Sequence, residues 1–293
     1  MGAQPVTQAQ WHRLIQAVAL GFGIGMALIS VHGAILWTDG QVYWAAGERL
    51  ATGEQLYPAD ADPDTAYRYA PWFAWAWALL TYLPEPMVAL GWTAGMMAAW
   101  ALPLPAFLRA GWTGRAVVFL AAPPLLIAAL GGNVQPALVA ILYAGLERRW
   151  GPAAIGLAAS LKIFPVFFVV VYAARREWLR AGVGVVLGAL LWLPTLAYGI
   201  DDFPRAIGGA FSLWTISPVV YLVPVALLVA WNWRKRSWPV ASLLVLVGSV
   251  RFVPYHLGYL LCSRPQLESS IPRIDIGQWT RTLRACGRQS NRA

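Results

Sequence analysis

Residues 37–71 read WTDGQVYWAAGERLATGEQLYPADADPDTAYRYAP and form the long polar segment that precedes the C-terminal tail. They follow directly on a strongly apolar run over residues 14–36. The segment carries six acidic side chains and two basic ones. Its first carboxylate, Asp39, lies where the apolar run ends, so a rigid helix can hold it in place. We expect this segment to be a structured loop that carries the active group of a membrane-embedded protein.

The composition excludes an ordinary soluble domain. Apolar residues make up 59% of the chain and charged residues 12%, about half the charged share of a globular protein. The apolar residues come in repeated runs separated by short arginine-rich turns, which is typical of a polytopic membrane protein. The net charge of +9 is spread over these turns, so we expect no nucleic-acid partner. Cys262 and Cys286 lack any metal-binding spacing.

The apolar runs predict an all-α bundle of about ten spans, several of them short or broken. Residues 71–83 are fewer than a membrane crossing normally needs, and two topologies are open. Either this segment crosses the membrane, or it dips in and returns, so that residues 86–108 make the inward crossing. The distribution of Lys and Arg favours re-entry. Short legs at membrane depth are tolerated where they line a wet or protein-buried cavity, so we expect an outward-facing cavity. These short legs are residues 136–146, 152–161, 165–174 and 254–263.

This topology sorts the charges between the two sides of the membrane. Asp201 and Asp202 join the acidic loop outside, and the basic turns fall inside. We expect one membrane domain over residues 1–263, with 37–70 as its outer catalytic loop, and a basic, poorly ordered cytoplasmic tail over 264–293. The residues of the basic turns are Arg148, Arg149, Arg175, Arg176, Arg180, Arg234, Lys235 and Arg236.

Within the loop, residues 41–53 predict an amphipathic helix that ends at Gly53. Tyr43 and Trp44 suit an interfacial position, because their rings bury while their polar atoms stay wet. Two roles compete for Asp39: a general base, or the N-cap of this helix, a position that Thr38 could take instead. The apolar face expected for the helix comprises Val42, Ala45, Ala46, Leu50 and Ala51.

The acidic tip of the loop, Asp60, Asp62 and Asp64, could bind a hard cation. It lies in a proline-containing stretch without a second anchoring element, which favours a solvated loop. We therefore expect no metal site and no cofactor.

Three cationic or titratable side chains interrupt the later apolar runs. Lys162 lies between two short legs, where it could bind a phosphate group or extend to the membrane surface. Arg251 and His256 flank the break at Pro254, and both can donate charged hydrogen bonds to an anion. A topological anchor for Arg251 and a structural role for His256 are the alternatives. Asn133 and Gln135, in the turn GGNVQ, could bind substrate or satisfy the helix ends beside them.

Four segments in this order resemble glycosyltransferase family 87, the bacterial polyprenyl-phosphate-mannose-dependent transferases of the GT-C fold. They are DGQVYWAAGERLATGEQLYP, YRYAPWFAWAWALLTYLP, GGNVQPALVAILYAGLERRW and GPAAIGLAASLKIFPVFFVVVYAARREW. The resemblance covers nearly the whole membrane part. It departs at Tyr69-Ala70-Pro71, where such families often have Tyr-Pro-Pro, and at Arg68, which could pair with a phosphate or a carboxylate.

The resemblance implies inverting transfer of a sugar, usually mannose, from a polyprenyl phosphate to a lipid or glycan acceptor. It places the active site on the outer face of the bacterial inner membrane, with Asp39 as the base and His256 near the donor phosphate. The substrate-binding residues that we predict are Lys162, Arg251, His256, Arg68, Tyr69, Asn133, Gln135 and Tyr43.

Two other functions fit part of the pattern. A transporter or lipid flippase would share the broken helices and the buried charges, but transporters usually carry internal repeats, and the long acidic loop has no counterpart in the second half. A non-catalytic scaffold of the cell envelope is the third possibility. Transfer of labelled sugar distinguishes the enzyme from both.

Overall fold

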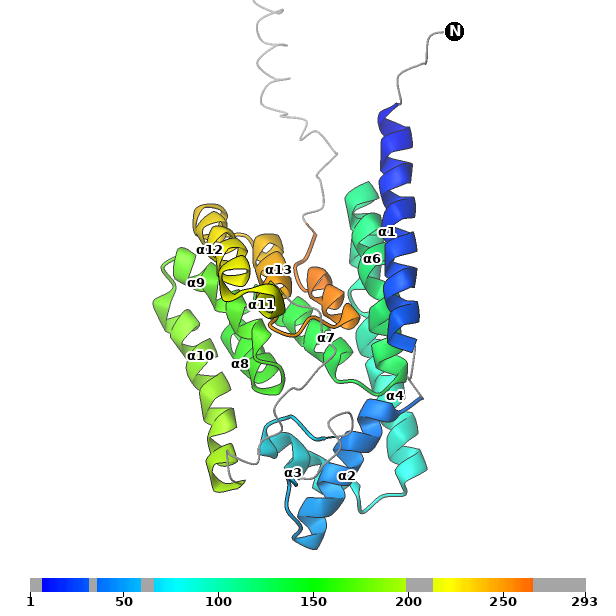
Figure 1. The fold of residues 1–293 in the computed structure, drawn as a ribbon, viewed down its shortest axis with the longest axis vertical. Helices are drawn as coiled ribbons and strands as arrows, with labels where there is room; N and C mark the ends of the chain where they lie inside the picture. The colour runs from blue at the N-terminus through cyan, green and yellow to red at the C-terminus, as the bar shows by residue number, and fades with distance from the viewer. Residues whose placement is uncertain (1–6, 32–35, 59–65, 199–212, 266–293) are drawn as a thin grey trace, which may run out of the picture.

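The structure is a computed structural model that describes residues 7–31, 36–58, 66–198 and 213–265. Regular secondary structure in these ranges is entirely helical, as the sequence predicts (Figure 1). The helices are α1 (Gln8–Val31), α2 (Thr38–Thr52), α3 (Pro71–Leu80), α4 (Glu85–Ala101), α5 (Leu104–Arg109), α6 (Gly111–Leu130), α7 (Gln135–Gly145), α8 (Gly151–Leu161), η1 (Phe164–Phe168), α9 (Val169–Ala174), α10 (Trp178–Trp192), η2 (Leu193–Tyr198), α11 (Leu213–Ile216), α12 (Pro218–Lys235), α13 (Trp238–Val247) and η4 (Pro254–Leu261).

Four helical stretches in the described ranges are long and apolar enough to cross a membrane. Shorter apolar helices occupy the positions of most of the predicted short legs. The predicted class, an all-α polytopic membrane protein with short helices among long ones, is confirmed, and the count of about ten spans stays a prediction. The four long stretches are Gln8–Ile29, Glu85–Arg109, Gly111–Leu130 and Trp178–Tyr198.

Glycines let helices of the bundle pack closely. At Gly23 on α1, an added Cβ would lie 2.9 Å from the carbonyl oxygen of Leu120 on α6. At Gly156 on α8, it would lie 2.9 Å from the carbonyl oxygen of Gly184 on α10. Small residues at such contacts are how membrane helices associate, because lipid tails offer no hydrophobic driving force. The outward sides remain apolar and exposed, as at Leu28, which is 65% exposed.

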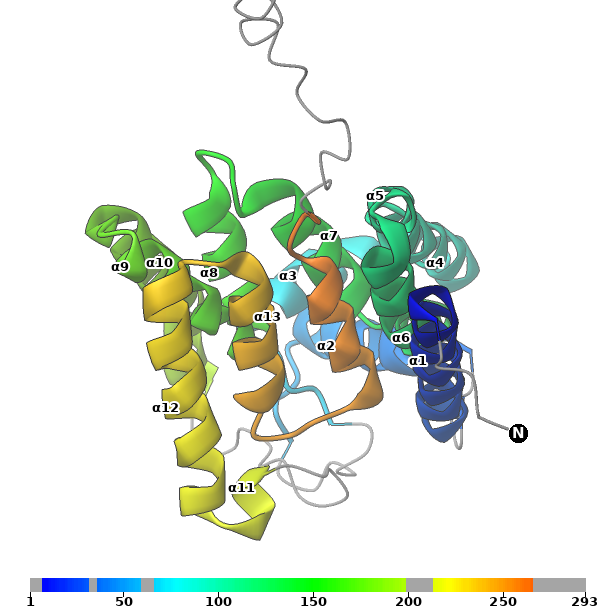
Figure 2. The same cartoon turned by 90° about the horizontal axis from the view of Figure 1, so that it is seen from above.

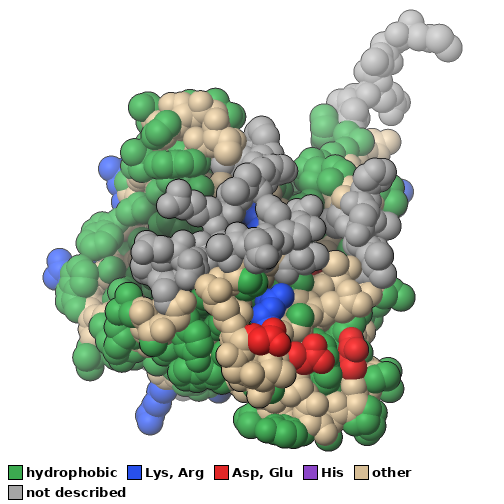
Figure 3. All heavy atoms as spheres, turned by 60° about the horizontal axis from the view of Figure 1, so that its bottom comes forward, with side chains coloured by type: hydrophobic (Ala, Val, Ile, Leu, Met, Phe, Trp, Pro, Cys, Tyr) green, Lys and Arg blue, Asp and Glu red, His purple; other side chains and the backbone are tan. Residues whose placement is uncertain are grey.

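Helices α2 and α3 form a separate layer at one end of the bundle (Figure 1). Pro71 starts α3, as expected, and α3 pairs with α2 at Gly47, where a Cβ would meet the Trp77 backbone at 2.7 Å. With ten residues, α3 is not among the stretches long enough to cross a membrane, and whether residues 71–83 cross or re-enter stays a prediction. Figure 3 shows acidic side chains beside basic ones on the face at this end.

The buried face of α2 differs from the predicted one. Tyr43 and Trp44 are buried, Tyr43 completely, whereas Ala51 is exposed. The interfacial placement of the two aromatic residues was therefore wrong. The helix packs on α3 through this face, and large aromatic rings gain more from burial than alanine does.

Helices α12 and α13 lie side by side across the direction of the long helices. In Figure 2, α1 is seen end-on while α12 and α13 are seen along their length. The predicted spans over 217–231 and 238–250 thus correspond to a helix pair that differs in direction from α1. The acidic tip 60–64, the turn with Asp201 and Asp202, and residues 266–293 of the tail lie outside the described residues.

Candidate active site

Backbone hydrogen bonds fix Asp39 against the end of α6. Its N–H donates to the carbonyl of Gly131 at 2.9 Å, and the N–H of Trp37 donates to Leu130 at 3.2 Å. The N-cap position of α2 is Trp37, in the left-handed region with φ 73° and without a side-chain cap. Asp39 therefore lies inside the first turn, and the alternative in which it caps the helix is wrong. A carboxylate in the first turn is favoured by the helix dipole.

The close approach of α2 and the α6–α7 turn depends on glycine. Gly132 has φ 75°, and a Cβ there would lie 3.0 Å from the backbone nitrogen of Gly40. Gly40 in turn faces the ring of Trp37 so closely that a Cβ would overlap it. Larger residues at either position would push Asp39 away from the turn that holds it.

Asn133 links Asp39 to Lys162. Its side chain hydrogen-bonds the Asp39 carboxylate, and its Oδ1 accepts the Gln135 backbone N–H at 2.8 Å and the Lys162 Nζ at 3.3 Å. Because backbone N–H and ammonium groups only donate, Oδ1 must face them and the amide NH₂ must face Asp39. Asn133 is 1% exposed. Both predicted roles therefore coincide, since Asn133 satisfies the start of α7 and also joins the polar cluster.

Lys162 ends α8 and points into this cluster. Besides its bond to Asn133, its Nζ lies 4.2 Å from the centre of the Tyr255 ring on η4. A cation over an aromatic face is attracted by the ring's negative face. Lys162 thereby connects α8, the α6–α7 turn and η4.

His256 and Arg251 approach from the other side of Lys162. His256 is 3% exposed, lies within electrostatic range of Lys162 and Arg251, and packs against Tyr255 with ring centroids 5.0 Å apart. Its Nδ1 accepts the Val253 N–H at 3.4 Å, so in the neutral ring Nε2 carries the proton and can donate. The Arg251 Nε is buried without a hydrogen-bond partner among the described residues.

Two tyrosines, Tyr43 and Tyr69, lie near Asp39. Tyr43 donates to the Tyr69 hydroxyl at 3.0 Å and accepts the Val134 N–H at 3.3 Å. Both tyrosines lie within electrostatic range of Asp39. Complete burial places Tyr43 behind Tyr69, so Tyr43 supports the cluster rather than lining it. Arg68 is partly exposed in the segment that leads into α3.

Gln135 and Tyr259 add a second buried polar contact. Both are completely buried, and the Gln135 side chain lies beside the Tyr259 hydroxyl. Neither makes another side-chain hydrogen bond within the described ranges. Buried polar atoms usually have partners, so this pair leaves hydrogen-bonding capacity next to the cluster.

The surroundings make Asp39 a stronger base. Burial away from water raises the pKa of its carboxyl above the ordinary value, while the charge of Lys162 and the Asn133 hydrogen bond lower it, and burial is the largest of the three effects. Asp39 is therefore a carboxylate that accepts a proton more readily than an exposed aspartate does. No group of three or more potential metal ligands occurs in the part of the chain that the structure describes.

The sequence analysis did not predict three features of the site: the Gly131 carbonyl that binds the Asp39 N–H, the close contact at Gly132, and the left-handed conformation of Trp37. The dipeptide Gly131-Gly132 before Asn133 was the available signal, because paired glycines mark a turn that needs positive φ or close backbone contact. Tyr255 stood out beside His256 in the sequence, but its contact with Lys162 needs the fold.

The fold and this cluster define a polytopic membrane protein that gathers a carboxylate, a lysine and an arginine around one end of its short helices. Comparison with protein families finds the model of glycosyltransferase family 87, which matches residues 67–205, somewhat under half of the chain. The match confirms the predicted resemblance to this family and indicates a glycosyltransferase. Comparison with curated proteins and with solved structures found no match.

The matched segment contains part of the cluster. Asn133, Gln135 and Lys162 lie inside residues 67–205, as do Arg68 and Tyr69. The other candidates lie outside it and reach the cluster through the contacts described above. These are Asp39, Tyr43, Arg251 and His256.

Proposed function

We propose that the protein transfers a sugar, mannose, from a polyprenyl-phosphate donor to a lipid or glycan acceptor with inversion of the anomeric carbon. The observation that carries this proposal is the partly buried Asp39, which hydrogen-bonds Asn133 and lies within reach of the cation of Lys162. A base next to a phosphate-binding cation is what transfer from a sugar phosphate to a hydroxyl requires.

Asp39 acts as the general base. The acceptor hydroxyl oxygen forms a bond to the anomeric carbon as the bond from that carbon to the phosphate oxygen breaks. The hydroxyl proton passes to Asp39, and polyprenyl phosphate leaves with the electron pair. A single carboxylate suffices for inversion by direct displacement, whereas retention by double displacement needs a second nucleophilic group.

Lys162, His256 and Arg251 stabilise the phosphate that leaves. Its charge grows as the sugar bond breaks, and donors fixed in a water-poor site stabilise such charge far more than water does. Lys162 supplies a full positive charge, Arg251 has an unpartnered Nε, and His256 offers Nε2–H. Tyr69 and Arg68 lie on the acceptor side, next to the segment that leads into α3.

Asn133 separates the base from the cation. A direct ion pair between Lys162 and Asp39 would lower the basicity of the carboxylate and occupy the ammonium. With a neutral amide between them, Asp39 retains one oxygen for the acceptor and Lys162 retains two N–H groups for phosphate. This arrangement serves both tasks in one cluster.

The site faces the outside of the bacterial inner membrane in this proposal. Asn133 follows the end of α6 and Lys162 follows the end of α8, whereas the basic turns precede α8 and α10. Basic turns favour the cytoplasmic side, which leaves the cluster at the opposite side, where the acidic loop begins.

The test uses membranes that contain the protein and radiolabelled polyprenyl-phosphate mannose. We expect label to appear covalently on a lipid or glycan fraction. Membranes from cells without the protein provide the background. Label that crosses the bilayer while it stays on the polyprenyl phosphate would instead identify a flippase. If the label neither moves to an acceptor nor crosses the bilayer, the protein would be a non-catalytic scaffold.

A further inference from the structure

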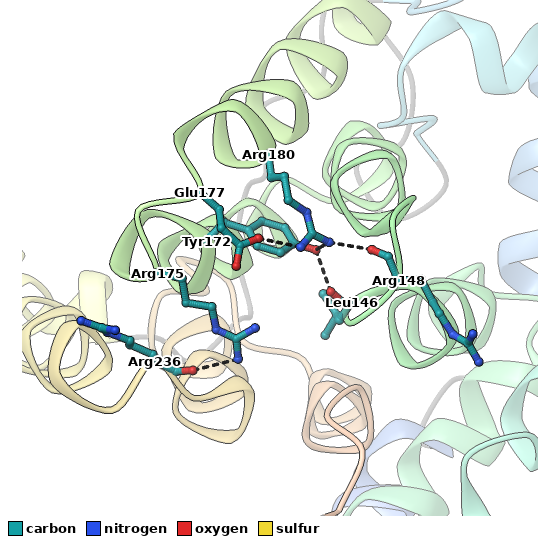
Figure 4. Close-up of polar contacts among 7 residues, drawn as sticks. All are labelled: Leu146, Arg148, Tyr172, Arg175, Glu177, Arg180 and Arg236. Carbon is teal, nitrogen blue, oxygen red and sulfur yellow. Dashed lines mark hydrogen bonds and ion pairs between the residues drawn. The ribbon is translucent and has the colours of Figure 1, made fainter.

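Hydrogen bonds and an ion pair connect the arginine-rich turns at the other end of the helices. Arg180 pairs with Glu177 at 2.6 Å and donates to the Arg148 carbonyl at 2.6 Å (Figure 4). Arg175 donates to the Arg236 carbonyl at 3.1 Å and lies over the Trp238 ring. These bonds join the turns before α8, before α10 and after α12.

The side chains of the other cations in these turns have no hydrogen-bond or ion-pair partner among the residues that the structure describes. We call them the arginine platform: Arg148, Arg149, Arg176, Arg234, Lys235 and Arg236. All six are exposed. Within the described ranges, the one ion pair is that of Glu177 with Arg180, and Glu147, the other acidic side chain of these turns, forms none. Figure 4 shows the Arg148 and Arg236 guanidinium groups directed away from the network, on opposite sides of it.

The backbone of the platform is held in an unusual conformation. Arg176 and Arg236 have φ of 63° and 51°, in the left-handed region that costs about 1–2 kcal/mol for a residue with a side chain. The carbonyl of Arg236 accepts the bond from Arg175, so the network stabilises one of these conformations. A backbone fixed in this way keeps the starting positions of the platform side chains constant.

The surface beside the platform is apolar. Trp178 on α10 and Trp233 on α12 are exposed, and their rings form a tilted pair with centroids 6.2 Å apart. Leu179 next to them is 82% exposed. Tryptophan marks the level of lipid headgroups, because its ring suits the boundary between hydrocarbon and water. The flanking Arg176 and Arg234 are therefore at headgroup level.

We propose that the arginine platform binds the phosphates of anionic phospholipids, with a headgroup seated at the Trp178–Trp233 pair between Arg176 and Arg234. Five of the six platform residues are arginine, and the planar guanidinium can bind two phosphate oxygens at once. The bound lipid bridges α10 and α12. This inference does not depend on the proposed transferase activity.

The test measures lipid retention on the full chain. Wild-type protein in nanodiscs of equal parts phosphatidylglycerol and phosphatidylcholine is released and weighed by native mass spectrometry. We expect bound phosphatidylglycerol to predominate. The double variant Arg176→Gln with Arg234→Gln should bind it about tenfold more weakly, because each basic residue near the surface contributes to attraction of anionic lipid.

The matched control removes two positive charges elsewhere. Arg109→Gln with Arg115→Gln changes the same number of exposed arginines, one at the end of α5 and one near the start of α6, and it should retain phosphatidylglycerol as the wild type does. Equal loss in both double variants would overturn the proposal, because general surface charge would then account for binding. Displacement of the lipid by millimolar inorganic phosphate would also overturn it, in favour of a site for free anions.

A second variant keeps the charge and guards against misfolding. Arg176→Lys with Arg234→Lys preserves topology but loses the paired guanidinium contacts. We expect weaker retention than in the wild type, with an unchanged elution volume on size exclusion. Wild-type retention in this variant would contradict the role given to the guanidinium groups.

Discussion

The arginine-rich turns and the candidate active site place opposite charges at different distances from each other. In the arginine-rich turns, Glu177 and Arg180 touch at 2.6 Å with both side chains about one third exposed. At the candidate active site, Asp39 and Lys162 share Asn133 as an intermediary, and the carboxylate is largely withdrawn from water. An exposed direct pair ties turns together at little energetic gain. A partly buried pair separated by an amide keeps both charges available for the proposed transfer.

The largest effect should come from Asp39→Asn. Removal of the base leaves the acceptor hydroxyl without a proton acceptor, and general base catalysis contributes typically 10²–10⁴-fold. We expect the rate of transfer to fall by about a thousandfold, measured as labelled product per minute with purified protein. Glu48→Gln is the matched control, because Glu48 is an exposed carboxylate on the same helix, and it should keep the wild-type rate.

The Asp39→Asn variant should fold at least as well as the wild type. Burial raises the pKa of Asp39, so the folded state binds a proton more tightly than the unfolded state does. That contribution to stability is present at low pH and is lost as pH rises through the folded pKa. At neutral pH the neutral asparagine avoids this loss, and thermal unfolding in detergent checks it. A strongly lowered unfolding temperature would mean that lost activity reflects lost structure.

Lys162→Met should reduce transfer by about a hundredfold, since the charge that stabilises the leaving phosphate is removed. The loss should appear in kcat as well as in kcat/KM, because phosphate charge increases in the transition state. Steady-state kinetics with varied donor concentration separate the two. An effect on KM alone would restrict Lys162 to donor binding.

Gly132→Ala should destabilise the protein by about 1–2 kcal/mol. The residue has φ 75°, and a Cβ would lie 3.0 Å from the Gly40 nitrogen, so both strain and contact oppose alanine. Gly53→Ala is the control, with φ 76° and open space around its Cβ position. Equal losses in denaturant titrations would show that φ alone is responsible.

The smallest effect should come from Glu177→Gln. The pair that it breaks is partly exposed, and such pairs contribute up to about 1 kcal/mol. We expect a small change in the free energy of unfolding and no change in transfer rate. A loss of activity here would contradict the separation between the two charged regions.

Much of the fold could be predicted from the sequence, because the patterns that determine it are local. The apolar runs placed the long helices, Pro71 and Gly53 marked helix ends, and Asp39, Asn133 and Lys162 stood out as polar residues near apolar legs. The buried face of α2 was not readable, because it depends on packing of Tyr43 and Trp44 against α3. The bridge from Asp39 through Asn133 to Lys162 joins three segments far apart in sequence, and no local pattern encodes such a contact.

The most direct test of the account is the pH dependence of the single-turnover rate in wild type and in Lys162→Met, at saturating donor. Transfer needs ionised Asp39, so the rate should fall toward acid with an apparent pKa above that of an exposed aspartate. Loss of Lys162 removes a positive charge that lowers this pKa, so the acid limb should move to higher pH in the variant. An acid limb at the same pH in both proteins would contradict the account.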